Sequence, residues 1–157
     1  MDADRHRYLG IFLNDHLAGA TAGVERARAA RGANEGTEFG PPLAAVCEEI
    51  EADRATLESI IDELGVGRSR IKPVIGRVGE RVGRLKPNGQ LRGYSALGRV
   101  IDLEVLLLGI AGKLRLWALL AELLDGESSA DPAALIARAE DQRSTVEELQ
   151  LRAVRLL

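Results

Sequence analysis

A chain of 157 residues and 16.9 kDa has the length of one globular domain and can form a core without disulfides or metals. Hydrophobic residues make up 46% of it and charged residues 29%, as is typical of soluble globular proteins, and the net charge is −3. Aromatic residues, at 3%, are too scarce for a base-stacking platform. One cysteine excludes an intramolecular disulfide and multi-cysteine zinc sites, and two histidines leave little room for a histidine-rich metal site.

The sequence predicts a cytoplasmic protein with no membrane span. The charged start, Met1 to Tyr8, is unlike a secretory signal, and no apolar region with a small-residue cleavage site follows it. The most apolar stretch, Leu103 to Leu124, contains four charged residues: Glu104, Lys113, Arg115 and Glu122. Because charges are costly inside a bilayer, we expect this stretch to form a buried helix.

The first two predicted helices span about 5–30 and about 42–64, and hardly any stretch alternates as a strand would. Turn residues 32–36 end the first helix, whose apolar face carries Leu9, Phe12, Leu13, His16, Ala20, Val24 and Ala27. Pro41 and Pro42 suit the first turn of the second helix, and Gly65 and Gly67 end it. The apolar face of this second helix carries Leu43, Val46, Cys47, Ile50, Leu57, Ile61 and Leu64.

Three further helices are predicted, over about 69–85, 95–124 and 132–156. Ser95 is a suitable N-cap for the second of these. Asp131 followed by Pro132 predicts an N-cap and a first helical position for the last one.

Connection lengths predict how the helices are arranged. Short loops join the first long helix to the second and the third to the fourth, so each pair is expected to form an antiparallel hairpin. Nearly thirty residues, Val66 to Gly93, separate the two hairpins and can carry the chain back along the bundle. We therefore predict one all-α domain, 1–157, a four-helix bundle whose long crossover contains the short basic helix. This order of long helices and crossover resembles the ferritin-like superfamily.

Three stretches, 8–23, 85–89 and 93–97, are also similar to a group of uncharacterised actinobacterial proteins, a resemblance that implies no activity. The ferritin-like resemblance implies a di-iron site made of carboxylates and two Glu-x-x-His motifs, whose i, i+3 spacing aims both ligands at the metals. No Glu-x-x-His occurs in this sequence. We therefore predict no catalytic residue, no metal ligand and no cofactor.

Polar residues interrupt the apolar helical faces near the middle of the helices: His16, Arg54, Glu104, Arg143 and Gln150. Charges inside a bundle are tolerated when they are paired, so the favoured interpretation is a structural, hydrogen-bonded core layer. The alternative is the pocket of a metal- or ligand-dependent enzyme. We interpret Cys47 as a small hydrophobic core residue.

The crossover is strongly basic. Residues 66–93 contain eight basic residues and one acidic residue, a net charge of +7, whereas the rest of the chain has 13 basic and 23 acidic residues, a net charge of −10. Four arginines share one side of the predicted helix 69–85: Arg70, Arg77, Arg81 and Arg84. The favoured interpretation is pairing with the acidic bundle, and the alternative is binding of nucleic acid or another anionic partner.

A short motif in the crossover resembles the nucleic-acid-binding core of KH domains. It runs from Val74 to Val82 and contains Gly-x-x-Gly. The helical patterns on both sides of it leave no strands for the sheet of a KH domain, so this interpretation is disfavoured.

The predicted helix 95–124 is apolar on two faces. One face is predicted to lie in the core: Leu97, Ile101, Val105, Leu108, Leu116, Leu119 and Leu123. The opposite face is predicted to be a dimer interface: Leu103, Ile110, Leu114 and Trp117. Because a helix that is apolar all round must be buried all round, we predict a homodimer. The sequence thus favours a non-enzymatic, self-associating scaffold or interaction protein.

Overall fold

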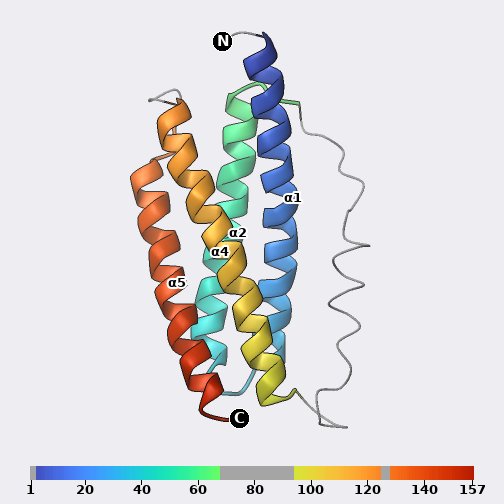
Figure 1. Cartoon of the computed structure of the whole chain (residues 1–157), viewed down its shortest axis with the longest axis vertical. Helices are drawn as coiled ribbons and strands as arrows, with labels where there is room; N and C mark the ends of the chain where they lie inside the picture. The colour runs from blue at the N-terminus through green and yellow to red at the C-terminus, as the bar shows by residue number, and fades with distance from the viewer. Residues whose placement is uncertain (1–2, 68–93, 125–127) are drawn as a thin grey trace.

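The computed structural model of this chain describes residues 3–67, 94–124 and 128–157. The described residues form α1 (Ala3–Ala33), α2 (Gly40–Glu63), α4 (Ala96–Leu124) and α5 (Pro132–Val154) (Figure 1). They contain no strand. The prediction of an all-α fold with four long helices is confirmed, and the helix predicted over 69–85 lies outside the described residues.

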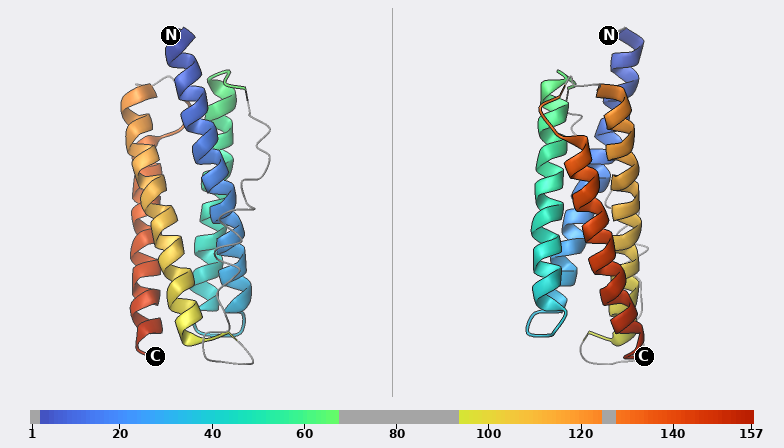
Figure 2. Two further views of the ribbon diagram at one scale, coloured as in Figure 1. Left: turned by 45° about the vertical axis from the view of Figure 1, so that its right-hand side comes forward. Right: turned by 90° about the vertical axis from the view of Figure 1, so that its left-hand side faces the viewer.

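The four helices form a bundle of two antiparallel hairpins, α1 with α2 and α4 with α5 (Figures 1 and 2). α1 also packs against α4, and α2 packs against α5. α2 and α4 run in the same direction, because α2 ends and α4 begins at opposite ends of the bundle (Figure 1).

Local capping explains where α4 and α5 begin. The Ser95 hydroxyl accepts a hydrogen bond of 2.9 Å from the backbone N–H of Gly98, three residues into α4. The Asp131 carboxylate accepts backbone hydrogen bonds from Ala133, at 3.0 Å, and from the residue after it, at 3.3 Å. Pro132 occupies the first turn of α5. Both predicted N-caps are confirmed.

The ends of α2 also follow from its sequence. Pro41 and Pro42 lie in its first turn, where a missing backbone N–H costs no helical hydrogen bond. After Glu63 the chain reverses at Gly65, whose φ of 64° lies in the left-handed region that glycine adopts without strain.

The core consists of two clusters of buried side chains along the bundle. One cluster includes Val24, Leu43 and Val146, and the other includes Leu13 and Leu57. Cys47 is also fully buried, and burial raises the pKa of its thiol. None of the helices in the described part of the chain is both long enough and apolar enough to cross a membrane.

Candidate functional site

The face of α4 that was predicted to bind a second subunit lies in the core of the monomer. Leu103, Ile110 and Trp117 are each at most 2% exposed. Leu114 is partly buried against both core clusters. The predicted dimer interface is therefore wrong, because these residues pack against the chain's own helices.

Most of the α4 face that was predicted to lie in the core is the outer one, whereas Leu116 of that predicted face is buried, at 3% exposed. Leu108 is 70% exposed, Leu97 is 42% exposed and Leu119 is 40% exposed. We call the following residues the α4 outer face: Leu97, Ile101, Val105, Leu108, Gly112, Leu119 and Leu123. In Figure 1, α4 crosses in front of α2, and no described helix lies in front of α4. The structure thus leaves an apolar helix face uncovered by the described residues.

Two oppositely charged residues flank the α4 outer face. Glu104 and Arg115 are both exposed and lie three helical turns apart on the same side of α4. Among the residues that the structure describes, neither forms an ion pair. Their positions, together with exposed Glu122, mark the outer side of α4. This is the sequence signal that could have separated the two apolar faces.

The five residues predicted to form a polar core layer do not lie together. Glu104 lies on the outer side of α4, and Arg143 is exposed on α5. Arg143 forms ion pairs within its own helix, with Glu140 and with Glu147. The prediction is corrected for Glu104 and Arg143, because their side chains reach solvent instead of a facing helix.

The other three predicted residues are partly buried at separate places. Arg54 forms an ion pair of 2.6 Å with Glu58 on its own helix, and its Nε donates a hydrogen bond to Thr21 of α1. His16 packs edge-on against the ring of Phe12, with 4.5 Å between the ring centroids. Burial lowers the pKa of His16, and the carboxylate of Asp15 opposes this shift. The Gln150 side chain donates a long hydrogen bond, 3.4 Å, to a backbone carbonyl of α4.

A different set of residues forms the buried polar cluster of this bundle: Asp53, Lys113, Arg138 and Gln142. Asp53, on α2, is 2% exposed. One of its carboxylate oxygens accepts a hydrogen bond of 2.8 Å from Nε of Arg138. The other oxygen accepts hydrogen bonds from the Lys113 ammonium and, at 3.1 Å, from Nε2 of Gln142. The Gln142 carbonyl accepts a second hydrogen bond from Lys113. This Asp53 cluster ties α2, α4 and α5 together.

The Asp53 cluster has the features of a structural network. Burial lowers the pKa of Lys113, and the nearby Asp53 carboxylate opposes this shift. A lysine with a lowered pKa can serve as a nucleophile when substrate can reach it. Here the Lys113 ammonium donates to both Asp53 and Gln142, and neither of the two best-formed cavities in the described part is lined by these residues. Among the described residues, no group of three or more His, Cys, Asp or Glu side chains could hold a metal ion.

The two cavities lie near the end of the bundle at which α1 begins. One, of about 50 Å³, is lined mainly by apolar residues and by Trp117, whose buried Nε1 has no hydrogen-bond partner among the described residues. That volume holds a few water molecules, not an organic ligand. The other, of about 370 Å³, is lined by His6 and Arg7 of α1 and by residues up to Gly67, where the described segment stops.

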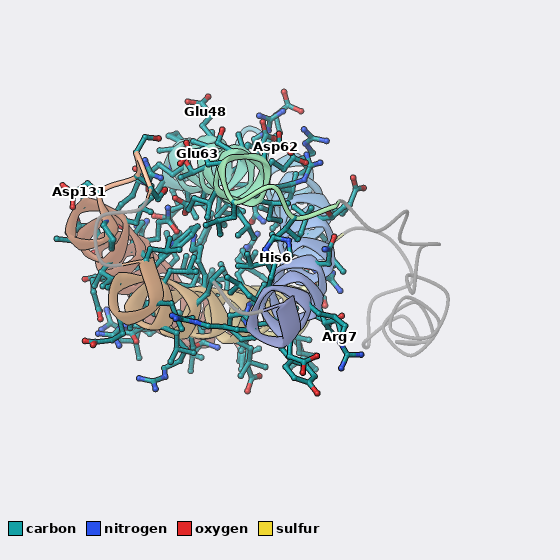
Figure 3. The ribbon with its side chains drawn as sticks, turned by 90° about the horizontal axis from the view of Figure 1, so that it is seen from above. His6, Arg7, Glu48, Asp62, Glu63 and Asp131 are labelled. Atoms are coloured by element: carbon teal, nitrogen blue, oxygen red, sulfur yellow. The ribbon has the colours of Figure 1, made fainter. Side chains whose placement is uncertain are left out.

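The same end of the bundle is closed by contacts between α2 and the connection to α5. The Glu63 carboxylate accepts hydrogen bonds from the Ser129 hydroxyl, at 2.5 Å, from the backbone N–H of Ser129, at 3.0 Å, and from the Ser128 hydroxyl, at 2.9 Å. These hydrogen bonds lower the pKa of Glu63. Viewed from above, Glu63 at the end of α2 lies on the side of the bundle toward Asp131 and the start of α5 (Figure 3). These contacts hold the connection before α5 against the end of α2.

The α4 outer face is an apolar helix surface that the described residues leave uncovered. The Asp53 cluster is internally paired, and the smaller cavity is too small for an organic ligand. We therefore take the α4 outer face, with Glu104 and Arg115 at its side, as the candidate functional site. No family model, curated protein or solved structure matches this chain.

Proposed function

We propose that this protein is a non-enzymatic, cytoplasmic helical-bundle scaffold or interaction protein that self-associates as a homodimer through the α4 outer face. The observation that carries the proposal is the exposure of Leu108, at 70%, in the middle of an apolar stripe. Monomeric proteins seldom leave a contiguous apolar patch open to water, and such patches mark interaction sites. The predicted partner is still a second copy of this chain. The surface that we assign to it is the α4 outer face, opposite to the face that the sequence analysis predicted.

The interior polar groups favour an interaction protein over an enzyme. An active site presents groups that are left free to meet a substrate. Asp53, Lys113 and Gln142 instead satisfy one another inside the bundle. The shared direction of α2 and α4 supports a ferritin-like topology, and the described residues lack the clustered metal ligands of a di-iron site.

The test replaces exposed leucines in the α4 outer face by glutamate. We expect the wild-type chain to sediment as a dimer at tens of micromolar, a concentration at which an interface of standard size persists. Leu108→Glu combined with Leu119→Glu should give a monomer with unchanged helix content by circular dichroism, because both side chains already face solvent in the monomer.

A matched control replaces two exposed leucines outside α4. Leu151 and Leu156 are 62% and 53% exposed, so Leu151→Glu combined with Leu156→Glu should leave the dimer intact. The proposal fails if the wild type is a monomer at this concentration. It also fails if the α4 variant keeps the wild-type mass.

A further inference from the structure

We infer that the two copies pack α4 against α4 in an antiparallel pair, around a two-fold axis beside residue 110. This inference rests on the proposed self-association and assigns its geometry. The evidence is the spacing of the α4 outer face, the charges at its side and the open space at its centre.

Six of the seven residues of the α4 outer face are symmetric in sequence about residue 110, and Val105 is the exception, since its counterpart is Arg115. Three pairs have their midpoint there: Leu97 with Leu123, Ile101 with Leu119, and Leu108 with Gly112. In an antiparallel pair related by a two-fold axis at residue 110, the two members of each pair lie opposite each other across the interface. Each of these pairs brings two apolar positions into contact across the interface. The two-fold axis repeats each contact, as an isologous interface requires.

The layer nearest the axis places a large side chain opposite a hollow. Leu108 is the most exposed residue of the stripe, at 70%. Gly112 is exposed, and among the described residues no atom beyond its chain neighbours and the backbone of its own helical turns lies within 4 Å of the position that a Cβ would occupy there. Leu108 of each copy can therefore pack over Gly112 of the other, in the manner of a knob entering a hole.

The charges beside the stripe favour the antiparallel direction. Glu104 and Arg115 lie on the same side of α4 and have their midpoint beside residue 110. The two-fold axis therefore brings Glu104 of each copy next to Arg115 of the other and forms two ion pairs. In a parallel pair, with the two-fold axis along the helices, Glu104 and Arg115 of one copy lie on the opposite side of the interface from those of the other copy, so these residues form no ion pair between the copies.

Charge reversal on the full-length chain tests this geometry. Glu104→Arg alone and Arg115→Glu alone should each raise the Kd of the dimer about tenfold or more at low salt, because each creates two like-charge contacts. The double variant, Glu104→Arg with Arg115→Glu, restores opposite charges and should return the Kd to within about threefold of wild type. Glu148→Arg, at an exposed position on α5, makes the same change in net charge as Glu104→Arg and should leave the Kd unchanged.

Sedimentation equilibrium of these four variants and the wild type gives the answer. Weakening by each single reversal, with recovery in the double variant, supports the antiparallel pair. A wild-type dimer whose Kd is insensitive to the reversals, or a double variant weaker than both single ones, overturns the antiparallel pair and leaves the proposed self-association standing. A monomeric wild type overturns both.

Discussion

Asp53 joins three helices through a single buried carboxylate. Replacing one partner of a buried ion pair is more damaging than replacing the whole pair, because the remaining charge loses its counter-ion. Asp53→Ala removes the counter-ion of Lys113 and of Arg138 and the acceptor of the Gln142 amide. We expect this change to lower the free energy of unfolding by about 3–5 kcal/mol.

Urea denaturation measures this loss, and Asp141→Ala is the matched control, since Asp141 is exposed on α5. The control should stay within about 0.5 kcal/mol of wild type. A loss at Asp53 no larger than at Asp141 would show that the cluster does not hold the bundle together.

His16 makes the stability of the bundle sensitive to acid. Burial lowers the pKa of His16 below its ordinary value of 6.5. As the pH falls, His16 of the unfolded chain takes up a proton near pH 6.5, before His16 of the folded chain does. The folded state therefore loses stability between pH 6.5 and the lowered pKa of His16 in the folded chain. His16→Gln removes this contribution.

Urea denaturation of wild type and His16→Gln at about pH 7.5 and about pH 5.5 isolates the effect, because the other titrating groups are common to both proteins. The wild type should lose more stability than the variant on acidification. Equal losses would mean that His16 titrates alike in the folded and unfolded chains.

The sequence predicted the caps of α4 and α5 and misassigned the polar residues of the core. Ser95 and Asp131 cap the helix that they precede, so the neighbouring residues suffice to identify them. Arg143 forms ion pairs with Glu140 and Glu147 of its own helix, at i−3 and i+4, a spacing that could have marked it as a surface residue. Asp53 shares the face of Ile50 and Leu57 at i−3 and i+4, a spacing that could have marked it as buried.

At the scale of elements, hydropathy alone could not decide which of the two apolar faces of α4 lies in the core. Both of its long faces carry leucine or isoleucine at helical spacing, so either could face the core. Lys113 lies on the face of Ile110 and Trp117, where a charge suggests the solvent side. In the structure that charge is buried and meets Asp53 of α2, a pairing that the sequence of α4 alone does not contain.

The start of α5 depends on its cap. The Asp131 carboxylate satisfies two backbone N–H groups of the first turn. Asp131→Ala should therefore cost about 1 kcal/mol of stability. Thermal denaturation measures this cost. The control is Asp141→Ala, the same substitution at an exposed position in the middle of α5. A loss of stability no larger than that of the control would rule out the capping role.

At the scale of the whole molecule, the charge asymmetry between 66–93 and the rest of the chain stays a sequence prediction. Residues 68–93 lie outside the described residues, and so do Arg70, Arg77, Arg81 and Arg84. If these arginines pair with the acidic remainder of the chain, neither the wild type nor Arg77→Glu with Arg81→Glu should bind RNA or DNA at low salt. Wild-type binding that weakens steeply with salt and is lost in the variant would instead favour an anionic partner.

The central claim is that the α4 outer face joins two copies of this chain, and the solution mass of the unmodified protein tests it most directly. Sedimentation equilibrium over a dilution series from tens of micromolar downward should give twice the chain mass of 16.9 kDa at the upper end. The mass should fall toward 16.9 kDa on dilution, as mass action requires. A mass of 16.9 kDa across the whole series would contradict the claim.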